Sequence, residues 1–361
     1  MAAGGENSRV KTLRLKVDAN NLGADEALDR AAAILRDGGL VALPTETVYG
    51  LGANALDRAA VERIFQAKSR PSWDPVIVHV ASQAMLDGLV EEVPEAARKL
   101  MAAFWPGPLT LLLKRTQAVP DAVTAGRPLV GVRMPAHPVA LELIRRAAVP
   151  VAAPSANRFG HVSPTTADHV LDDLDGRVDA VLDAGPTSRG VESTVLDPST
   201  SPMMIYRPGA VTAEQIDAIA GPVALFRSGE PLRETPVAAL PSPGVGLRHY
   251  APRARLVLIE APIAELGARL AQAARSEQGE RLGVMLPEGI SAATGIAVKE
   301  IAAQIYPWGS WSAPETMAHG LYAGLRALDA AECTVIFCPL PPEEGIGAAI
   351  RDRLIKAATR S

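Results

Sequence analysis

The 361-residue chain has only two cysteines, Cys333 and Cys338, and both lie in one short apolar run. They are not spaced as Cys-x-x-Cys, and their apolar neighbours favour two buried small side chains over a metal or redox site. No apolar run in the sequence approaches the roughly 18 residues of a membrane span. Residues 1–16 lack the apolar core of a signal peptide. We therefore expect a cytoplasmic protein with no membrane partner.

Aromatic residues make up only 4% of the chain, and the formal net charge is -4. This charge balance removes the long-range attraction on which a general nucleic-acid binder depends, although a local basic cleft remains compatible with it. The sequence also has no Gly-x-x-x-x-Gly-Lys-Ser/Thr loop, no Gly-x-Gly-x-x-Gly, no His-Glu-x-x-His and no Gly-x-Ser-x-Gly. A bound nucleotide would therefore need a non-standard pocket.

The length and the 48% of hydrophobic residues are sufficient for two folded domains. Hydrophobic periodicity predicts a mixed α/β domain over residues 1–220, and strand–helix alternation predicts a smaller parallel α/β domain over 254–361. Between them, residues 221–253 are rich in Pro and Gly and indicate a linker or lid. Strands are predicted at 40–43, 76–80, 109–113, 129–133, 149–153, 180–182, 194–196, 203–206, 255–260, 281–286 and 334–337. Helices are predicted at 25–35, 59–67, 94–103, 138–147, 165–171, 213–219, 263–275, 314–328 and 346–358.

The most informative segment is residues 44–52, Pro-Thr-Glu-Thr-Val-Tyr-Gly-Leu-Gly, which follows the apolar run 40–43. Hydroxyls, a carboxylate and two glycines at this point indicate a strand that ends in a polar, tightly turning floor. Further polar groups follow or end other apolar runs in the same way. Together these strand ends predict a single pocket.

Lys68 and Arg70 stand one residue apart on an irregular segment that leads into the strand 76–80. Two cations in this position can converge on one anion such as a triphosphate. Solvated surface charges are the plainer interpretation of the same pair.

Ser155 and Asn157 follow the apolar run 149–153, at the strand end where open α/β sheets bind ligands. A simple turn explains the same residue types. Ser163 begins a Ser-Pro-Thr-Thr segment that suits either a helix N-cap or a phosphate at a helix N-terminus.

Arg133 ends a buried strand and needs a carboxylate or phosphate partner, so a ligand and a structural ion pair are equally compatible with it. His79 by itself indicates a satisfied core histidine. Residues 192–194 and Arg207 bring further polar groups to the last two strands of the first domain, and each is ambiguous alone.

Taken together, these segments resemble the YrdC family, and specifically its two-domain members, the L-threonylcarbamoyladenylate synthases. The resemblance covers the first domain and the linker, whereas the C-terminal domain is similar mainly in position, length and strand–helix order. The matching stretches are 44–55, 68–80, 104–110, 130–138, 153–164, 190–195, 206–209 and 248–252.

The resemblance implies a YrdC-like mixed twisted open sheet with helices, followed by the linker and a Rossmann-like parallel α/β domain. It implies synthesis of threonylcarbamoyl-AMP and pyrophosphate from L-threonine, bicarbonate and ATP, with Mg²⁺ on the phosphates. The product would serve threonylcarbamoyladenosine modification of tRNAs that read ANN codons, so tRNA would be met only indirectly through a downstream transferase complex. Positioning of anions and stabilisation of spread charge suffice for this chemistry.

The resemblance also implies roles for individual residues, with Lys68, Arg70 and Arg133 as the catalytic set. L-threonine or its carbamate would be held by Thr47, His79, Arg133, Ala153 and Ser193. ATP would be surrounded by Lys68, Arg70, Asp74, Leu129, Ser155, Asn157, Ser163 and Arg207, with His249 and Tyr250 closing over it from the linker. No protein side chain would be a fixed metal ligand.

Two positions depart from the family pattern. Asp74 stands where relatives often have Asn, and an acid there would repel phosphate unless it faces Mg²⁺ or an arginine. Residues 245–247, Val-Gly-Leu, lack the charge and the phenol that the family linker commonly carries.

Two other functions compete with synthesis. An RNA-binding module of the same fold would show salt-dependent RNA affinity without ATP turnover, but the acidic balance and the few aromatics oppose it. A carbamoyl-transfer domain of hydrogenase maturation enzymes would require acylphosphatase and zinc-finger segments, and the chain has only two cysteines.

Overall fold

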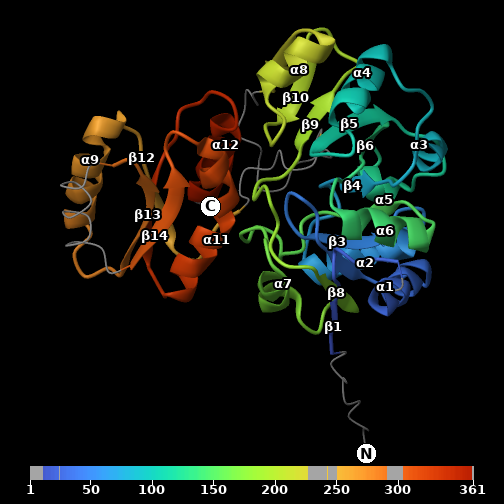
Figure 1. Cartoon of the computed structure of the whole chain (residues 1–361), viewed down its shortest axis with the longest axis horizontal. Coiled ribbons are helices and arrows are strands. Elements are labelled where there is room, and N and C mark those ends of the chain that lie inside the picture. Colours follow the sequence, from blue (N-terminus) through green and yellow to red (C-terminus); the bar gives the residue numbers. More distant parts are fainter. Residues whose placement is uncertain (1–10, 24, 227–241, 243–249, 291–303, 360–361) are drawn as a thin grey trace, which may run out of the picture.

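A computed structural model describes residues 11–23, 25–226, 242, 250–290 and 304–359. They form one large mixed sheet and, after the 227–249 region, a separate four-stranded sheet (Figure 1). Among the described residues, no helix combines the length and the apolar composition needed to cross a membrane.

The large sheet has the strand order β1-β8-β2-β3-β7-β4-β6-β5-β9-β10-β11. Its strands are β1 (Leu13–Lys16), β2 (Val41–Leu43), β3 (Gly50–Asn54), β4 (Ile77–His79), β5 (Leu109–Lys114), β6 (Leu129–Arg133), β7 (Val151–Ala152), β8 (Ala180–Asp183), β9 (Thr194–Asp197), β10 (Met203–Arg207) and β11 (Val223–Leu225). The sheet contains both parallel and antiparallel pairs, for β4 is parallel to β6 but antiparallel to β7. This confirms the predicted mixed α/β sheet.

Helices cover this sheet on both sides and bury its apolar residues in two large clusters. They are α1 (Glu26–Arg36), α2 (Arg58–Lys68), α3 (Gln83–Leu89), α4 (Glu95–Phe104), α5 (Asp121–Thr124), α6 (Pro138–Ala147), α7 (Ala167–Leu174) and α8 (Ala213–Ala220). Local chemistry sets their starts: Asp57 caps α2 through its carboxylate, and Thr212 and Gln215 form a capping box on α8.

The second sheet is entirely parallel, in the order β12-β15-β13-β14, as the strand–helix alternation predicted. Its elements are β12 (Arg255–Ile259), α9 (Ile263–Arg275), β13 (Leu282–Glu288), β14 (Gln304–Ser310), α11 (Pro314–Ala330), β15 (Val335–Pro339) and α12 (Gly347–Ala358). In Figure 1, α11 and α12 lie on the side of this sheet that faces the first domain, and α9 lies on the outer side. Cys333 and Cys338 are buried and unbridged, as expected.

Most predicted elements are present, but several short ones were missed. The predicted polar floor after residue 43 includes strand β3, which begins at Gly50 and pairs with β2 and β7. Strand β11 lies in the range assigned to the linker, and it pairs with β10 of the first sheet. Strand β3, Gly-Leu-Gly-Ala-Asn, is too rich in glycine for period-two alternation to reveal it, and the three residues of β11 adjoin a stretch rich in Pro and Gly. Residues 245–247 lie outside the described part of the chain.

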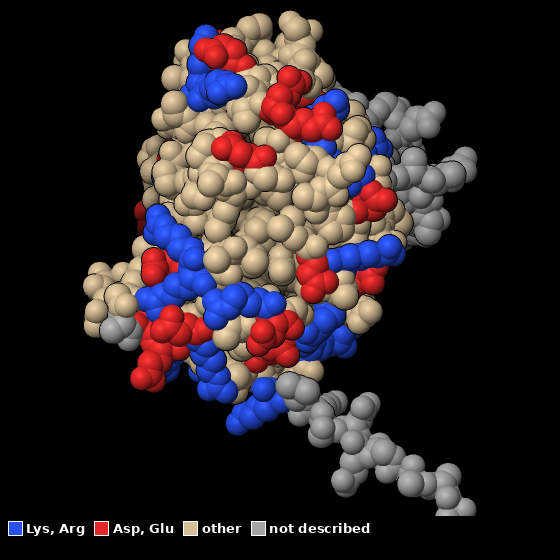
Figure 2. Space-filling model, turned by 90° about the vertical axis from the view of Figure 1, so that its right-hand side faces the viewer, with Lys and Arg blue, Asp and Glu red and all other residues tan. Residues whose placement is uncertain are grey.

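Figure 2 shows one face of the molecule, formed by the first domain. Basic and acidic side chains lie beside one another on it. Several charged side chains of this domain pair, such as Arg14 with Asp183 at 2.7 Å and Arg146 with Asp29 at 2.9 Å. Among the described residues on this face the two signs are interspersed, unlike the single-sign patch that favours a nucleic-acid backbone.

Candidate active site

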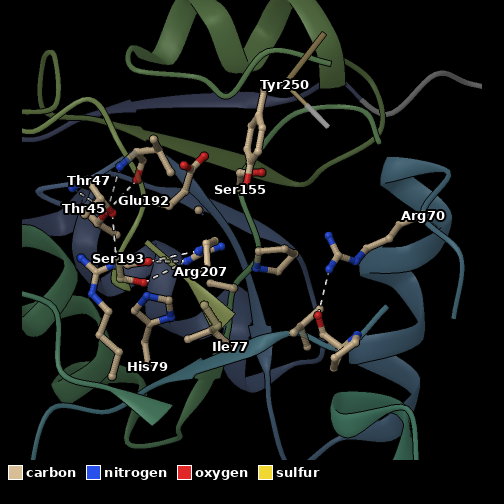
Figure 3. Close-up of a pocket in the computed structure, with 17 residues that line it drawn as sticks. Thr45, Thr47, Arg70, Ile77, His79, Ser155, Glu192, Ser193, Arg207 and Tyr250 are labelled. Carbon is tan, nitrogen blue, oxygen red and sulfur yellow. Dashed lines mark hydrogen bonds between the residues drawn. The ribbon is translucent and has the colours of Figure 1, made fainter. Parts of the chain in front are cut away.

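Polar residues from separate strands line one cavity in the first domain (Figure 3). Its walls come from the 45–50 segment, the ends of β4, β6, β9 and β10, the loop after β7, and Tyr250. The lining residues are Thr45, Thr47, Val48, Gly50, Arg70, Pro75, Val76, Ile77, His79, Arg133, Ala153, Pro154, Ser155, Glu192, Ser193, Arg207 and Tyr250.

The floor of the cavity is shaped by hydroxyl hydrogen bonds within the segment between β2 and β3. Thr45 Oγ1 donates to the Val48 carbonyl at 2.6 Å and lies 2.8 Å from Thr47 Oγ1. The Tyr49 side chain points away from the floor, since its hydroxyl donates to the Gly185 carbonyl at 2.7 Å. These bonds hold the two threonine hydroxyls at the cavity in fixed positions.

Arg133, at the end of β6, is buried in an ion pair with Glu46, at 2.6 Å between Nη2 and Oε1. Its Nη1 donates to Thr47 Oγ1 at 3.0 Å, and its Nε donates to the Gly107 carbonyl at 3.1 Å. Burial by itself would raise the pKa of Glu46, but the adjacent guanidinium outweighs burial, so the pKa is lowered. Of the two interpretations of Arg133, a structural ion pair is thus present, and the side chain still reaches the cavity.

His79 lies beside Arg133 because β4 and β6 pair in parallel with these residues in register. Burial, reinforced by the charge of Arg133, lowers the pKa of His79 to about 3, so the ring is neutral near pH 7. Its Nδ1 is buried and has no hydrogen-bond partner within the described structure. His79 is therefore not the fully satisfied core histidine that its position alone indicated.

Ser193 and Arg207 meet where β9 begins and β10 ends. Arg207 Nη2 donates to the Ser193 carbonyl at 2.9 Å and to Ser193 Oγ at 3.0 Å. Ser193 Oγ also lies 2.8 Å from Thr110 Oγ1. A second cation and a hydroxyl are thereby fixed on the cavity wall (Figure 3).

Arg70 reaches the cavity from the irregular segment after α2, which ends with Ser69 in the left-handed conformation. Its guanidinium pairs with Asp74 at 2.9 Å and donates to the Pro75 carbonyl at 2.8 Å. Asp74 is fully buried, and burial outweighs Arg70 to raise the pKa of its carboxyl. The unusual acid at position 74 thus faces an arginine, one of the two partners that would make it compatible with phosphate nearby.

Lys68 lies behind the cavity wall and not on it. The side chain is 1% exposed, and Nζ donates to the backbone carbonyls of Ser155, at 2.5 Å, and Asn157. Burial and then the charge of Arg70 lower the pKa of Lys68 well below its usual value. The lysine therefore holds the Ser155–Asn157 loop in place.

The structure brings most of the predicted site residues together. Those on the cavity are Thr47, Arg70, His79, Arg133, Ala153, Ser155, Ser193, Arg207 and Tyr250. Those not among the lining residues are Lys68, Asp74, Leu129, Asn157 and Ser163. Asn157 Nδ2 donates to the His161 carbonyl at 2.7 Å, which orders the loop, and His249 lies outside the described residues.

Glu192 was not predicted as a site residue, although the polar segment 192–194 contains it. Glu192 lines the cavity and accepts a hydrogen bond from Ser163 Oγ at 2.7 Å. A single carboxylate before a strand carries no signal of its own. Its partners lie far away in the chain, so no local pattern identifies it.

The cavity encloses about 60 Å³, far less than the roughly 300–1,000 Å³ typical of small-molecule pockets. A nucleotide is larger than this volume, so it would not lie wholly inside the cavity in this conformation. No group of three or more His, Cys, Asp or Glu side chains that could hold a metal ion lies within the described ranges.

Two family models together match most of the chain. The model described as "Telomere recombination", which carries the names Sua5, YciO and YrdC, matches residues 33–209. The model described as "Threonylcarbamoyl-AMP synthase, C-terminal domain" matches residues 211–359. Their order is the order of the two sheets along the chain.

Relatives and a solved structure agree with these matches over nearly the whole length. The chain is 43% identical to threonylcarbamoyl-AMP synthase of Bacillus subtilis, over 92% of this chain and 93% of the relative. It is 40% identical to the protein of the same name from Pyrococcus abyssi, over 91% and 93%. The crystal structure of P. abyssi Sua5 in complex with L-threonine superposes with a TM-score of 0.85 at 38% identity, covering 96% of this chain and 97% of that one. The chain therefore belongs to the two-domain Sua5 branch of the Sua5/YciO/YrdC family.

Proposed function

We propose that this protein is an L-threonylcarbamoyladenylate synthase, which makes threonylcarbamoyl-AMP and pyrophosphate from L-threonine, bicarbonate and ATP. The observation that carries the proposal is the convergence of three arginines, Arg70, Arg133 and Arg207, with the hydroxyls of Ser155 and Ser193 on one cavity. Cations and hydroxyls from separate strands form a site for anionic groups, and each substrate and product carries at least one: the carboxylate of threonine, bicarbonate, or a phosphate. The names of the relatives and the threonine complex of the P. abyssi protein support the same activity.

The reaction needs positioning more than covalent chemistry. The amine of threonine forms a carbamate with carbon dioxide from bicarbonate and loses a proton. A carbamate oxygen then forms a bond to the α-phosphorus of ATP, and the bond from that phosphorus to the bridging oxygen breaks, so pyrophosphate leaves. Negative charge moves toward the leaving group, which arginines fixed in a buried site stabilise without reorganisation.

The threonine end of the cavity is assigned to Thr47, His79, Arg133, Ala153 and Ser193. Arg133 would bind the carboxylate of threonine. The ion pair with Glu46 compensates the buried charge of this arginine. The neutral His79 ring, with its unpaired Nδ1, would accept or donate one hydrogen bond to the amino acid.

The nucleotide end is assigned to Arg70, Ser155 and Arg207 on the cavity. Of the other residues assigned to the nucleotide, Lys68 holds the Ser155–Asn157 loop and Asp74 pairs with Arg70, so both would act through these neighbours. Leu129, Asn157 and Ser163, which are not lining residues, would also contribute to the nucleotide end. Tyr250 would cover the nucleotide and exclude water, together with His249. We further propose that Mg²⁺ arrives bound to the phosphates of ATP.

The chemistry of the product indicates the reaction that would consume it. Threonylcarbamoyl-AMP is a mixed anhydride, so its threonylcarbamoyl group can be transferred to an amine such as that of adenosine in tRNA by a downstream transferase complex. We propose that the protein works in the cytoplasm and meets tRNA only through that complex.

Incubation with ATP, L-threonine and ¹³C-bicarbonate, followed by mass spectrometry, tests the activity. We expect labelled threonylcarbamoyl-AMP and pyrophosphate in equal amounts, with both dependent on threonine. Pyrophosphate release that does not depend on threonine and bicarbonate would contradict the proposal. RNA binding with steep salt dependence and no turnover would instead identify an RNA-binding module.

A further inference from the structure

A buried network links the cavity to the second domain through Glu192. The Glu192 carboxylate lies on the cavity wall, and two side chains of the C-terminal domain donate to it. Arg353 Nε of α12 donates to Oε2 at 2.8 Å, and Tyr322 Oη of α11 lies 2.8 Å from Oε2 and 3.0 Å from Oε1. Glu192 and Arg353 are 6% and 1% exposed, so the pair is protected from solvent.

The same two residues of the second domain also hold Tyr250. The Tyr250 ring stacks on the Tyr322 ring, with centroids 5.7 Å apart and planes inclined by 25°. The Arg353 guanidinium lies 5.2 Å from the centroid of the Tyr250 ring, in cation–π range. In Figure 3, Tyr250 reaches the cavity from the side opposite His79.

The first domain is shaped to receive α11 at this point. Gly190, two residues before Glu192, has φ of +73°, and a Cβ on it would lie 2.5 Å from the backbone carbonyls of Ala318 and His319. Only glycine permits this close approach. The segment that carries Glu192 therefore packs directly on the backbone of α11.

We propose that Arg353 and Tyr322 are positioning residues for the reaction, because they fix the Glu192 carboxylate and the Tyr250 ring and so build one wall of the cavity from the second domain. The inference rests on the proposed synthesis only for its kinetic readout. Neither side chain lines the cavity, so each acts through Glu192 and Tyr250. The wall is complete only when the two domains are in contact.

Arg353→Met tests the proposal, since it keeps the apolar stem and removes the charge. A misplacement of about 1 Å at a reacting site costs about 100-fold in rate, and we expect kcat/KM for ATP or threonine to fall about 10- to 100-fold. Arg353→Lys should recover part of the loss, because it restores a positive charge. Arg351→Met is the matched control: it lies on the same helix and pairs with Glu260 at 2.6 Å, outside the network, and should leave kcat/KM unchanged.

Two further variants decide the outcome if Arg353→Met does not fold. Tyr322→Phe keeps the stacked ring and deletes only the hydroxyl bonded to Glu192, and we expect a several-fold lower kcat/KM. The double variant Glu192→Gln/Arg353→Met removes both charges of the pair together, so the net buried charge is unchanged and the protein should fold. We expect it to remain as slow as the poorer single variant, because the two residues act as a unit. Folded variants with wild-type kinetics would overturn the proposal.

The proposed function and this inference can fail separately. If the wild-type protein makes no threonylcarbamoyl-AMP, the proposed function is wrong. Calorimetric titration with L-threonine and with ATP then measures whether the wall contributes to ligand binding. Weaker binding to Arg353→Met than to Arg351→Met would support the positioning role. Equal binding would overturn it.

Discussion

Two buried arginine–glutamate pairs border the cavity, and they are arranged in opposite ways. In the pair Glu46–Arg133 both residues belong to the first domain, and the arginine faces the cavity. In the pair Glu192–Arg353 the domains contribute one residue each, and the carboxylate faces the cavity. The first pair thus presents a compensated cation to a ligand, and the second makes the shape of the wall depend on contact between the domains.

The partners of these residues explain how so many charges remain buried around one cavity. A buried charge is tolerated when a partner and further hydrogen bonds compensate it. Arg133 has Glu46, Thr47 and the Gly107 carbonyl, whereas Glu192 has Arg353, with Tyr322 and Ser163 as additional donors. Removal of one member of either pair should therefore affect folding as well as catalysis.

The largest effect should come from Arg133→Met. Glu46 would stay buried without its cation, so we expect the free energy of unfolding to fall by about 3–5 kcal/mol and turnover to fall about 100- to 1,000-fold. Urea unfolding and pyrophosphate release measure the two effects. The double variant Glu46→Gln/Arg133→Met should recover most of the stability but none of the turnover. Wild-type turnover of the double variant would remove Arg133 from the site.

The second pair should appear in the pH dependence of stability. Burial would raise the pKa of Glu192, but Arg353 and Arg207 outweigh it and hold the pKa at about 2. Because this folded-state pKa is below the unfolded value, the stabilisation is complete above about pH 4.5 and is lost as pH falls toward 2, about 3 kcal/mol in all. We expect the free energy of unfolding, measured in urea from pH 2 to 6, to depend less on pH in Glu192→Gln than in the wild type. The same pH dependence in both proteins would mean that Glu192 is not held ionised.

A smaller effect is expected where a pair is local to one segment. Arg70→Met removes charge-assisted hydrogen bonds and should lower kcat/KM for ATP about 10- to 100-fold. Because Asp74 is buried beside it, Arg70→Met/Asp74→Asn should be more stable than the single variant and equally slow. Restored kinetics in the double variant would mean that Arg70 only neutralises Asp74.

The smallest effect should come from an exposed pair. Arg281 and Glu332 lie 3.0 Å apart with side chains 59% and 71% exposed. We expect Arg281→Met to change the free energy of unfolding by at most about 0.5 kcal/mol and to leave turnover unchanged. A loss like that of Arg133→Met would show that burial is not what distinguishes these pairs.

The periodicity of the sequence predicted the elements that carry a long apolar pattern. Helices α6 and α9 and strand β6 have the predicted bounds, because each has several apolar residues at the right spacing. Strands β3 and β11 were missed, since pairing with their sheet neighbours, and not their own composition, makes them strands. The C-terminal strand β14, which pairs with β13, was missed as well.

The candidate site was predicted through polar residues at strand ends and through the family resemblance. These signals identified Arg70, Arg133 and Ser155, which the structure places on one cavity. They also selected Lys68, which lies behind the lining and is bonded to backbone carbonyls. Residue type and spacing indicate that a lysine is near a site, but not which way its side chain points.

The sequence by itself determined the order of strands and helices and the polar character of the strand ends, because both depend on residues that are neighbours in the chain. Only the tertiary structure decided which charges pair. Glu192 and Arg353 are 161 residues apart and Glu46 and Arg133 are 87 apart, and no local pattern specifies such partners. Packing of the two domains brings Glu192 and Arg353 together and completes the wall of the cavity.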